Sequence, residues 1–386
     1  MFCNKCGFEV EDGANFCPMC GAQFQLNRQV DTKNLNEKKQ KTKKPGNPKQ
    51  KILIALACIC ALIPIIMLIS GVAFRMGMNH YSDGVYYKYD KVTDSARVYG
   101  ASKKKSSVRI SHTIRVGFEK YSVTIVGNSA FAGSGKPSSV TISNSVTTIE
   151  DNAFTRNSEL TNVTIPDSVT MIGRGAFGYC ENLTSITIPN SVTTIEEETF
   201  RECEKLANIT IPNSVTAIKK GAFESCENLT SITIPESVTS LGDSVFAGCS
   251  SLTDITIPDG VTSVGHGAFY QCKSLTDITI PDSVTSIGER AFYQCTSLTD
   301  IIIPDGVTSI GDSAFYGCSS LTSVTMPDSV TSIGNDAFEM CSENLTITVY
   351  RSTEGTGDGE PYSEDDFVDE NAYREYSDFG DTSGLK

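Results

Sequence analysis

Histidine is scarce in this chain, and the short motifs typical of enzymes are absent. The 386 residues include three histidines, His80, His112 and His266, which lie far apart in the sequence and in no motif. No phosphate-binding loop, nucleophile elbow or metal-hydrolase signature occurs. The sequence therefore favours a protein without enzymatic activity.

Basic residues outnumber acidic ones in the first 51 residues. The formal net charge is −14, yet residues 1–51 carry ten Lys/Arg against five Asp/Glu, so the remainder carries −19. Because the basic residues form a single run and not a basic domain, a nucleic-acid partner is disfavoured.

Charge is missing altogether from residues 52–74, ILIALACICALIPIIMLISGVAF. At ~1.5 Å per residue a helix of this length spans roughly 34 Å, enough for a hydrocarbon core of about 30 Å. Pro64 near its centre is tolerated in membrane helices. A buried core helix is the alternative, and a signal peptide is disfavoured because about 50 residues precede the run. We expect one transmembrane helix over 52–74.

The residues before this run predict its orientation. Residues 23–51 are rich in Lys, Gln and Asn, a composition that cannot form a core and is typical of a flexible linker. Seven lysines crowd the N-terminal side of the apolar run, whereas only Arg75 lies close to its C-terminal side. The positive-inside rule then predicts a cytoplasmic N-terminus and places residues 75–386 outside the cell. The same lysines can also contact anionic lipid.

Residues 1–22 contain four cysteines in two CxxC pairs: Cys3, Cys6, Cys17 and Cys20. Two such turns can complete a tetrahedron of thiolates with no open position, so we expect a structural zinc site in a zinc ribbon over 1–22, with iron as the alternative metal. Two disulfides or a redox CxxC are the other readings, and a cytoplasmic location argues against disulfides. A cytoplasmic protein, the membrane machinery or, less favoured, a nucleic acid could contact this ribbon.

A 23-residue repeat dominates the rest of the chain. Several residue types recur in phase: the prolines Pro166 to Pro327, the leucines Leu160 to Leu321, the cysteines Cys180 to Cys341 and the phenylalanines Phe131 to Phe338. Such a period predicts a solenoid in which each coil buries its apolar face against its neighbours.

One coil shows the expected local structure. Leu183, Ile186 and Ile188 predict a short strand that Pro189 ends, because proline cannot donate to a ladder. Val192 and Ile195 then point inward from a second short extended piece, and Phe200 and Cys203 share one face of a short helical turn. Glycine follows the second extended piece in many coils and suits a turn with positive φ; these are Gly173, Gly242, Gly265, Gly288, Gly311 and Gly334. We expect a mainly β fold with short helical turns.

Both ends of the solenoid depart from the repeat. Residues 80–118 contain three β-like runs and are placed to cap the first coil. At the other end LTITVY supplies a closing strand, and residues 354–386 carry eleven acidic residues against Arg374 and Lys386. We therefore expect a β-rich cap over 80–118 and an acidic disordered tail over 351–386.

The unit IPxSVTxIGxxAFxxCxxLTxIT resembles the BspA-like class of leucine-rich repeats, over about residues 115–350, and we set the repeat domain at 119–350. CNKCG…CPMCG resembles the short zinc ribbons of bacterial membrane proteins, and the combination resembles Gram-positive cell-envelope proteins. The resemblance implies a surface solenoid that binds host, matrix or neighbouring-cell proteins, and it implies no catalytic residues.

Two surface columns are candidate binding sites. Asp254, Asp277 and Asp300 share one outward strand position in consecutive coils, which invites a basic partner or a cation such as calcium; solvated turns are the alternative. The second column follows the phenylalanine and could form a contact surface or simply pack between coils. It consists of Tyr270, Tyr293 and Tyr316.

The eight repeat cysteines are the last distinctive group. Equivalent positions in stacked coils lie within disulfide reach, but in-register side chains run parallel and cysteine packs well as a small buried residue. We expect buried free thiols.

These features support three functions. The first is a membrane-anchored surface protein whose polar Ser, Thr and Asp-lined sheet or acidic edge binds a protein or an envelope polymer. The second is a transmembrane signalling protein that reports such binding to the cytoplasmic ribbon. The third is a structural envelope component without a specific ligand.

Overall fold

The computed structural model describes residues 78–133 and 135–351. These residues belong to the unit Arg75–Lys386. The predicted zinc ribbon (1–22), linker (23–51) and transmembrane helix (52–74), and residues 352–386 of the predicted acidic tail, lie outside the described residues. Within the described ranges there is no helix capable of crossing a membrane.

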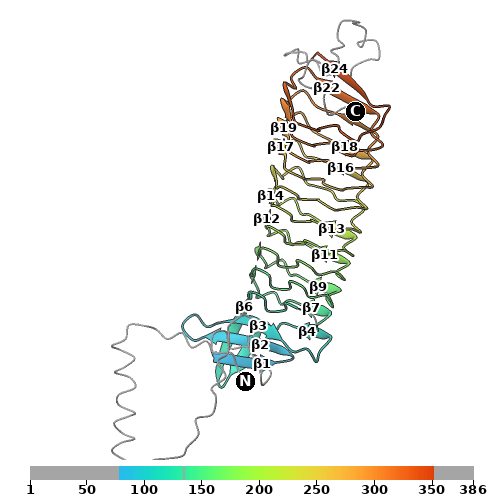
Figure 1. Ribbon diagram of the computed structural model, residues 1–386. Coiled ribbons are helices and arrows are strands. Elements are labelled where there is room, and N and C mark those ends of the chain that lie inside the picture. The colour runs from blue at the N-terminus through green and yellow to red at the C-terminus, as the bar shows by residue number, and fades with distance from the viewer. Residues whose placement is uncertain (1–77, 134, 352–386) are drawn as a thin grey trace, which may run out of the picture. The chain divides into compact units, whose positions relative to one another are not determined.

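The chain enters the solenoid through a β-rich segment, residues 78–126, which we call the entry segment. Its first three strands, β1 (Met78–Ser82), β2 (Val85–Asp90) and β3 (Ser95–Ala101), pair antiparallel in sequence order. β3 then pairs parallel with β6 (Glu119–Val126), which also pairs antiparallel with β5 (Thr113–Val116). This sheet continues into the first coils, because β6 pairs parallel with β8 (Thr148–Ile149). Figure 1 shows the entry segment at one end of the stack.

Most coils contribute one strand to each of two columns that run along the stack (Figure 1); the coil that contains β15 contributes to column A only an isolated bridge at Ser231. Where equivalent strands of neighbouring coils pair, they do so parallel and in register; Ile186 pairs with Ile209, and Ile195 with Ile218. The pairing is interrupted along each column, so that the columns consist of several short sheets. Column A contains the longer strands: β4 (Ser107–Arg109), β7 (Ser139–Thr141), β9 (Asn162–Thr164), β11 (Ser185–Thr187), β13 (Asn208–Thr210), β16 (Asp254–Thr256), β18 (Asp277–Thr279), β20 (Asp300–Ile302), β22 (Ser323–Pro327) and β24 (Thr346–Tyr350). Column B contains two-residue strands: β8, β10 (Met171–Ile172), β12 (Thr194–Ile195), β14 (Ala217–Ile218), β15 (Ser240–Leu241), β17 (Ser263–Val264), β19 (Ser286–Ile287), β21 (Ser309–Ile310) and β23 (Ser332–Ile333).

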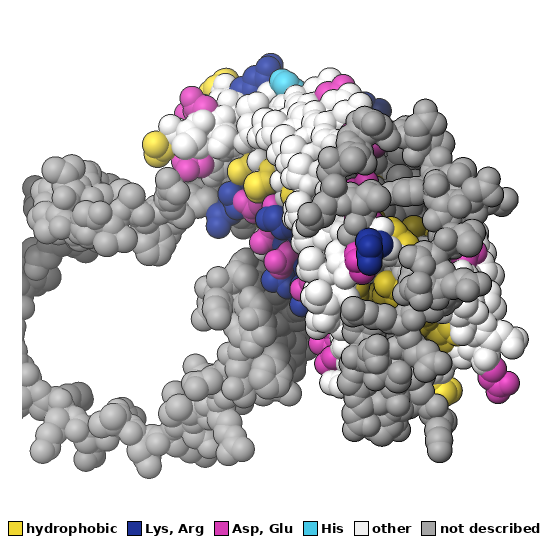
Figure 2. Space-filling view, turned by 90° about the horizontal axis from the view of Figure 1, so that it is seen from above, with side chains coloured by type: hydrophobic (Ala, Val, Ile, Leu, Met, Phe, Trp, Pro, Cys, Tyr) yellow, Lys and Arg dark blue, Asp and Glu magenta, His cyan; other side chains and the backbone are white. Residues whose placement is uncertain are grey.

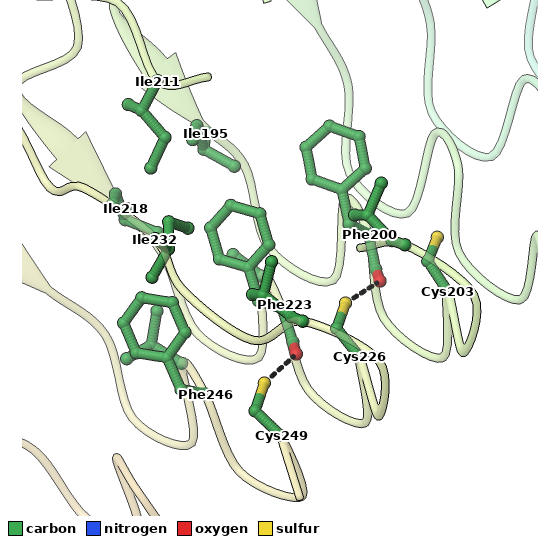
Figure 3. Packing of buried hydrophobic residues seen from close by; sticks show 14 of the residues in the cluster. Ile195, Phe200, Cys203, Ile211, Ile218, Phe223, Cys226, Ile232, Phe246 and Cys249 are labelled. Carbon is green, nitrogen blue, oxygen red and sulfur yellow. Dashed lines mark hydrogen bonds between the residues drawn. The ribbon is translucent and has the colours of Figure 1, made fainter. Parts of the chain in front are cut away.

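The core is a set of apolar columns inside the coils. The central residue of most column A strands is buried between two exposed neighbours, as in β11 and β16. Phenylalanine rings stack from Phe131 to Phe338, with successive centroids 4.8 to 5.7 Å apart. Figure 3 shows three of them, Phe200, Phe223 and Phe246, in one row. Each of these contacts joins side chains from two neighbouring coils, so a single coil could not bury its own apolar side chains.

The segment between column B and column A forms turns, and no helix occurs among the described residues. Phe200 and Cys203 are both buried on one face, as predicted. The backbone does not continue into a helix because successive N–H groups donate alternately to acceptors in the same coil and in the next coil. The N–H groups of Thr199 and Arg201 donate within the coil, whereas those of Glu198, Phe200 and Glu202 donate to the next coil. A φ of 55° at Glu198 and 54° at Glu202 directs this alternation.

The prediction that the in-phase glycines take positive φ is wrong. The positive φ falls two positions later, at Ser313 (54°) after Gly311 and at Arg290 (55°) after Gly288. The glycines are needed for close approach between coils. A Cβ on Gly311 would lie 2.5 Å from the backbone nitrogen of Glu289 in the preceding coil, a distance that real Cβ atoms do not show.

Candidate functional site

The aspartate column lies on the outer face of column A. Asp254 and Asp277 are exposed and pair directly in register, and Asp300 is exposed at the same position of β20. Asp254 and Asp300 each accept a hydrogen bond from the preceding threonine hydroxyl, at 2.8 and 2.7 Å. Within the described part of the chain no three carboxylate, imidazole or thiol side chains converge on a metal site. The geometry therefore gives the calcium alternative no support.

The tyrosine column, which we call the tyrosine ladder, lies on the turn face that connects columns B and A. Tyr270, Tyr293 and Tyr316 stack with centroids 5.0 Å apart and interplanar angles of 9° and 6°. All three are half-buried. Beside them, Gln271 Nε2 donates to Gln294 Oε1 at 2.7 Å. Packing between coils thus covers part of each ring and leaves the rest facing solvent.

A carboxylate lies near the C-terminal end of the ladder. Partial loss of contact with water, with the nearby Glu339 carboxylate, raises the pKa of Tyr316 above its ordinary value.

The two predicted columns do not form one site. Asp254 and Asp277 belong to column A, whereas the ladder belongs to the turn face. Figure 2, seen from the β24 end, shows that backbone atoms and uncharged polar side chains, drawn in white, dominate the visible described surface, with hydrophobic side chains scattered.

A charged cluster lies on the turn face earlier in the stack, and the sequence reading missed it. Arg201 lies 3.5 Å from Glu198 and 3.0 Å from Glu224, and its guanidinium carbon is 5.8 Å from the centroid of the Tyr179 ring. Arg174 contacts Glu197 at 3.4 Å. Arg174 and Glu197, like Arg201 and Glu224, occupy equivalent positions of successive repeats, so opposite charges one period apart are the signal that identifies such pairs.

Many of the hydroxyls expected to line a binding sheet are used inside the fold. Thr216 Oγ1 donates to the carbonyl oxygen of Thr193 one coil earlier at 3.4 Å, and Ser214 Oγ donates to the carbonyl oxygen of Val192 at 2.6 Å. The threonine bond recurs in the next coil at Thr239, and a corresponding bond precedes column A at Thr253. These hydroxyls donate to backbone carbonyl oxygens of the preceding coil, and so they link neighbouring coils.

The eight repeat cysteines are free, and all but Cys341 are fully buried, which confirms the prediction of buried thiols. Each thiol donates to the carbonyl oxygen of a phenylalanine in the preceding coil, as Cys226 does to Phe200 at 3.2 Å (Figure 3). Burial raises the pKa of Cys203 and Cys249 to about 12. The thiols are therefore structural donors.

Comparison with known families decides the class of this solenoid. The model for the BspA type leucine rich repeat region matches residues 124–253 and 241–358, in six copies. The chain belongs to the BspA-type leucine-rich repeat family. A zinc-ribbon domain model matches residues 2–24.

Several solved structures are similar to this BspA-type chain. One is a leucine rich cell surface protein from Faecalibacterium prausnitzii, 26% identical, covering 72% of this chain and 95% of its own, with a TM-score of 0.37. Another is the pneumococcal vaccine antigen PcpA, 20% identical over 72% of this chain and 89% of its own, with a TM-score of 0.43. A third is a leucine-rich repeat protein from T. pallidum, 25% identical over 57% and 91%, with a TM-score of 0.40. No curated protein matches this chain.

Proposed function

We propose that this BspA-type protein is anchored in the bacterial cell membrane by residues 52–74 and binds a protein or envelope polymer on its external solenoid, without enzymatic activity. The observation that carries the binding role is the tyrosine ladder. Three half-exposed aromatic rings stand in line on a stack whose coils are tied to one another through backbone and side-chain hydrogen bonds.

The ladder has the properties of a contact surface. Tyrosine offers a large apolar area with few rotatable bonds, so little conformational entropy is lost when a partner packs against it. Stacking at 5.0 Å already fixes the rings of Tyr270, Tyr293 and Tyr316. The aspartates of column A are exposed carboxylates, and ion pairs at such exposed positions contribute little.

Adhesion assays on cells that express the full chain test this role. The triple variant Tyr270→Ser, Tyr293→Ser, Tyr316→Ser should lose adhesion to a panel of immobilised matrix proteins and envelope polymers, by about ten-fold or more in apparent affinity. The matched control replaces Asp254, Asp277 and Asp300 with serine and should bind as the parent chain does. Loss of adhesion only in the aspartate variant would move the site to column A.

The anchor rests on the sequence of residues 52–74 and on the lysines before it. Protease treatment of intact cells tests the topology, with separate antibodies against residues 1–22 and the solenoid. The solenoid should be degraded while the N-terminal epitope survives. A solenoid that is cut only in broken cells would contradict an external location and direct the search to intracellular partners.

The zinc ribbon supplies a structural metal site in this proposal. The thiols of Cys3, Cys6, Cys17 and Cys20 form a donor set of four soft ligands, which suits zinc and leaves no position for substrate. When bound, zinc would stabilise the fold of this small domain. Elemental analysis of the purified chain should give one zinc that the double variant Cys3→Ser, Cys17→Ser lacks. One iron, or no metal in chain purified under reducing conditions, would contradict the assignment.

A further inference from the structure

The two most exposed large apolar side chains of the entry segment stand clear of its core. Phe118 is 109% exposed and Val92 is 88% exposed. Phe118 follows Gly117 in the two-residue turn of the β5–β6 hairpin, where Asn, Asp and Gly are the usual residues. A single exposed apolar residue needs no explanation. Neither side chain contributes to the core, so the fold gives no reason for a phenylalanine at this turn.

The two side chains lie on neighbouring hairpin tips. Val92 belongs to residues 91–94, which join β2 to β3, and Phe118 to residues 116–119; we call these the two hairpin tips. Lys91 Nζ in one tip lies 3.5 Å from Glu119 Oε2 in the other. Behind them, the Ser122 N–H donates to the Asp94 carbonyl oxygen at 3.1 Å. These two contacts place the tips side by side on one edge.

The chain enters the entry segment at this same edge. Met78, the first residue of β1, pairs with Tyr89, next to the turn that carries Val92. The apolar run ends at Phe74, so three residues separate it from β1. Four Cα steps reach about 14 Å at most. If residues 52–74 span the bilayer, this edge is tethered within about 14 Å of the hydrocarbon, at the depth of the headgroup layer.

The entry segment is net positive, whereas the stack is net negative. Residues 78–126 carry nine Lys/Arg against four Asp/Glu, whereas residues 127–351 carry ten against 26. The entry segment is attracted to anionic headgroups, and the acidic stack is repelled by them. The negative charge of the stack therefore disfavours its contact with an anionic membrane. The tips themselves carry Lys91 against Asp94 and Glu119, and Lys105 lies beside Gly84, in the β1–β2 turn at the opposite end of β2.

We propose that the two hairpin tips dock on the outer leaflet of the bilayer that residues 52–74 span, with Phe118 and Val92 inserted at the headgroup boundary. This inference rests on the proposed membrane anchor. Docking would fix the base of the solenoid against the membrane, and it gives two exposed apolar side chains a burial that the fold itself does not provide.

The absence of tryptophan from the chain provides a direct test. The variant Phe118→Trp places a single fluorophore on one tip of the full chain, reconstituted in phosphatidylglycerol-containing vesicles with lipid brominated on its acyl chains. Its emission should shift to the blue and lose intensity relative to vesicles without bromine. The variant Val92→Trp, on the other tip, should respond in the same way.

The matched control is Ile302→Trp, on an exposed residue of β20 that is 68% exposed and lies far along the acidic stack. Its emission should be unaffected by bromolipid. If the tip fluorophores are quenched no more than the one at position 302 while the chain floats with the vesicles, docking is refuted and the anchor stands. A chain that does not float with vesicles refutes the anchor, and docking with it.

Discussion

At the scale of single residues, the space between neighbouring coils limits the size of the side chain at the position that follows each column B strand. Gly288 and Gly311 lie where the backbone of one coil passes closest to the next, and a Cβ at either would meet backbone atoms 2.5 to 2.7 Å away. Two earlier coils carry Glu196 and Lys219 at this position, and they form a salt bridge of 2.8 Å on the surface. The inter-coil hydrogen bond at this position has nearly the same length in both cases, 2.9 Å from Lys219 N–H and 2.8 Å from Gly311 N–H, so a side chain is accepted in those coils.

Gly311→Ala tests this close approach. The added methyl group meets backbone and not a flexible side chain, so the variant should lose about 1–3 kcal/mol of unfolding free energy, measured by chemical denaturation. Glu196→Ala is the control: it already has a Cβ at the equivalent position and should lose only about 0–1 kcal/mol from its exposed ion pair. Equal losses in both variants would contradict the packing explanation.

Each buried cysteine combines an apolar filling role with one hydrogen bond. Cys249 Sγ donates to the Phe223 carbonyl oxygen at 3.2 Å and is fully buried. Cys249→Ala should cost about 1–3 kcal/mol, because it leaves a small cavity and removes the donor. Differential scanning calorimetry measures the loss. Cys341→Ala, at the partly exposed end of the same column, serves as control and should lower the Tm less.

At the scale of elements, the coil is the unit of folding. Strands of neighbouring coils pair at an offset of one full repeat, for example Val264 with Ile287, so removal of a whole coil joins chain ends that already match. Deletion of residues 254–276 should therefore leave a folded, shorter solenoid with a lower unfolding free energy and a smaller denaturant m-value.

Deletion of residues 254–265 provides the comparison, because it leaves half a coil that cannot complete the apolar columns. Circular dichroism and denaturant titration should show a folded shorter chain for the whole-coil deletion and a strongly destabilised one for the half-coil deletion. Two equally folded products would show that the coils are not in strict register.

The repeat predicted which positions face inward in the two strand columns, but it predicted the backbone conformation of the turns less well. The apolar positions of one coil, such as Ile186 and Val192, identify the inward side of both columns because burial depends on spacing along the coil. The turn after Phe200 resembles a helix in the sequence, since its i, i+3 spacing is the same. In the structure every second N–H of this turn donates to a carbonyl oxygen of the neighbouring coil, and these hydrogen bonds replace those of a helix.

At the scale of the whole molecule, the eight stacked thiols make the unfolding free energy depend on pH in the alkaline range. Burial raises the pKa of Cys295 to about 12 and of Cys341 to about 11, against an ordinary value of 9.0. The unfolded chain releases these protons near pH 9, whereas the folded chain retains them. The stabilisation is complete below pH 9 and is lost as the pH rises from 9 toward 12.

Urea denaturation across this range, under reducing conditions, should show unfolding free energy falling by up to about 1.4 kcal/mol per pH unit for each buried thiol. The variant Cys249→Ala should show a slope shallower by one proton. An unchanged slope in this variant would show that lysine and tyrosine titration, and not the thiols, govern alkaline unfolding.

The sequence by itself determined the period, the two strand columns, the buried phenylalanines and the free thiols, because equivalent positions of successive repeats become neighbours in any stack. It also named both candidate columns, Asp254 to Asp300 and Tyr270 to Tyr316. Only the tertiary structure placed them on different faces, engaged the Ser and Thr hydroxyls between coils, and put Val92 beside Phe118. These outcomes depend on distances between coils and on how two hairpins pack, which no spacing within one coil specifies.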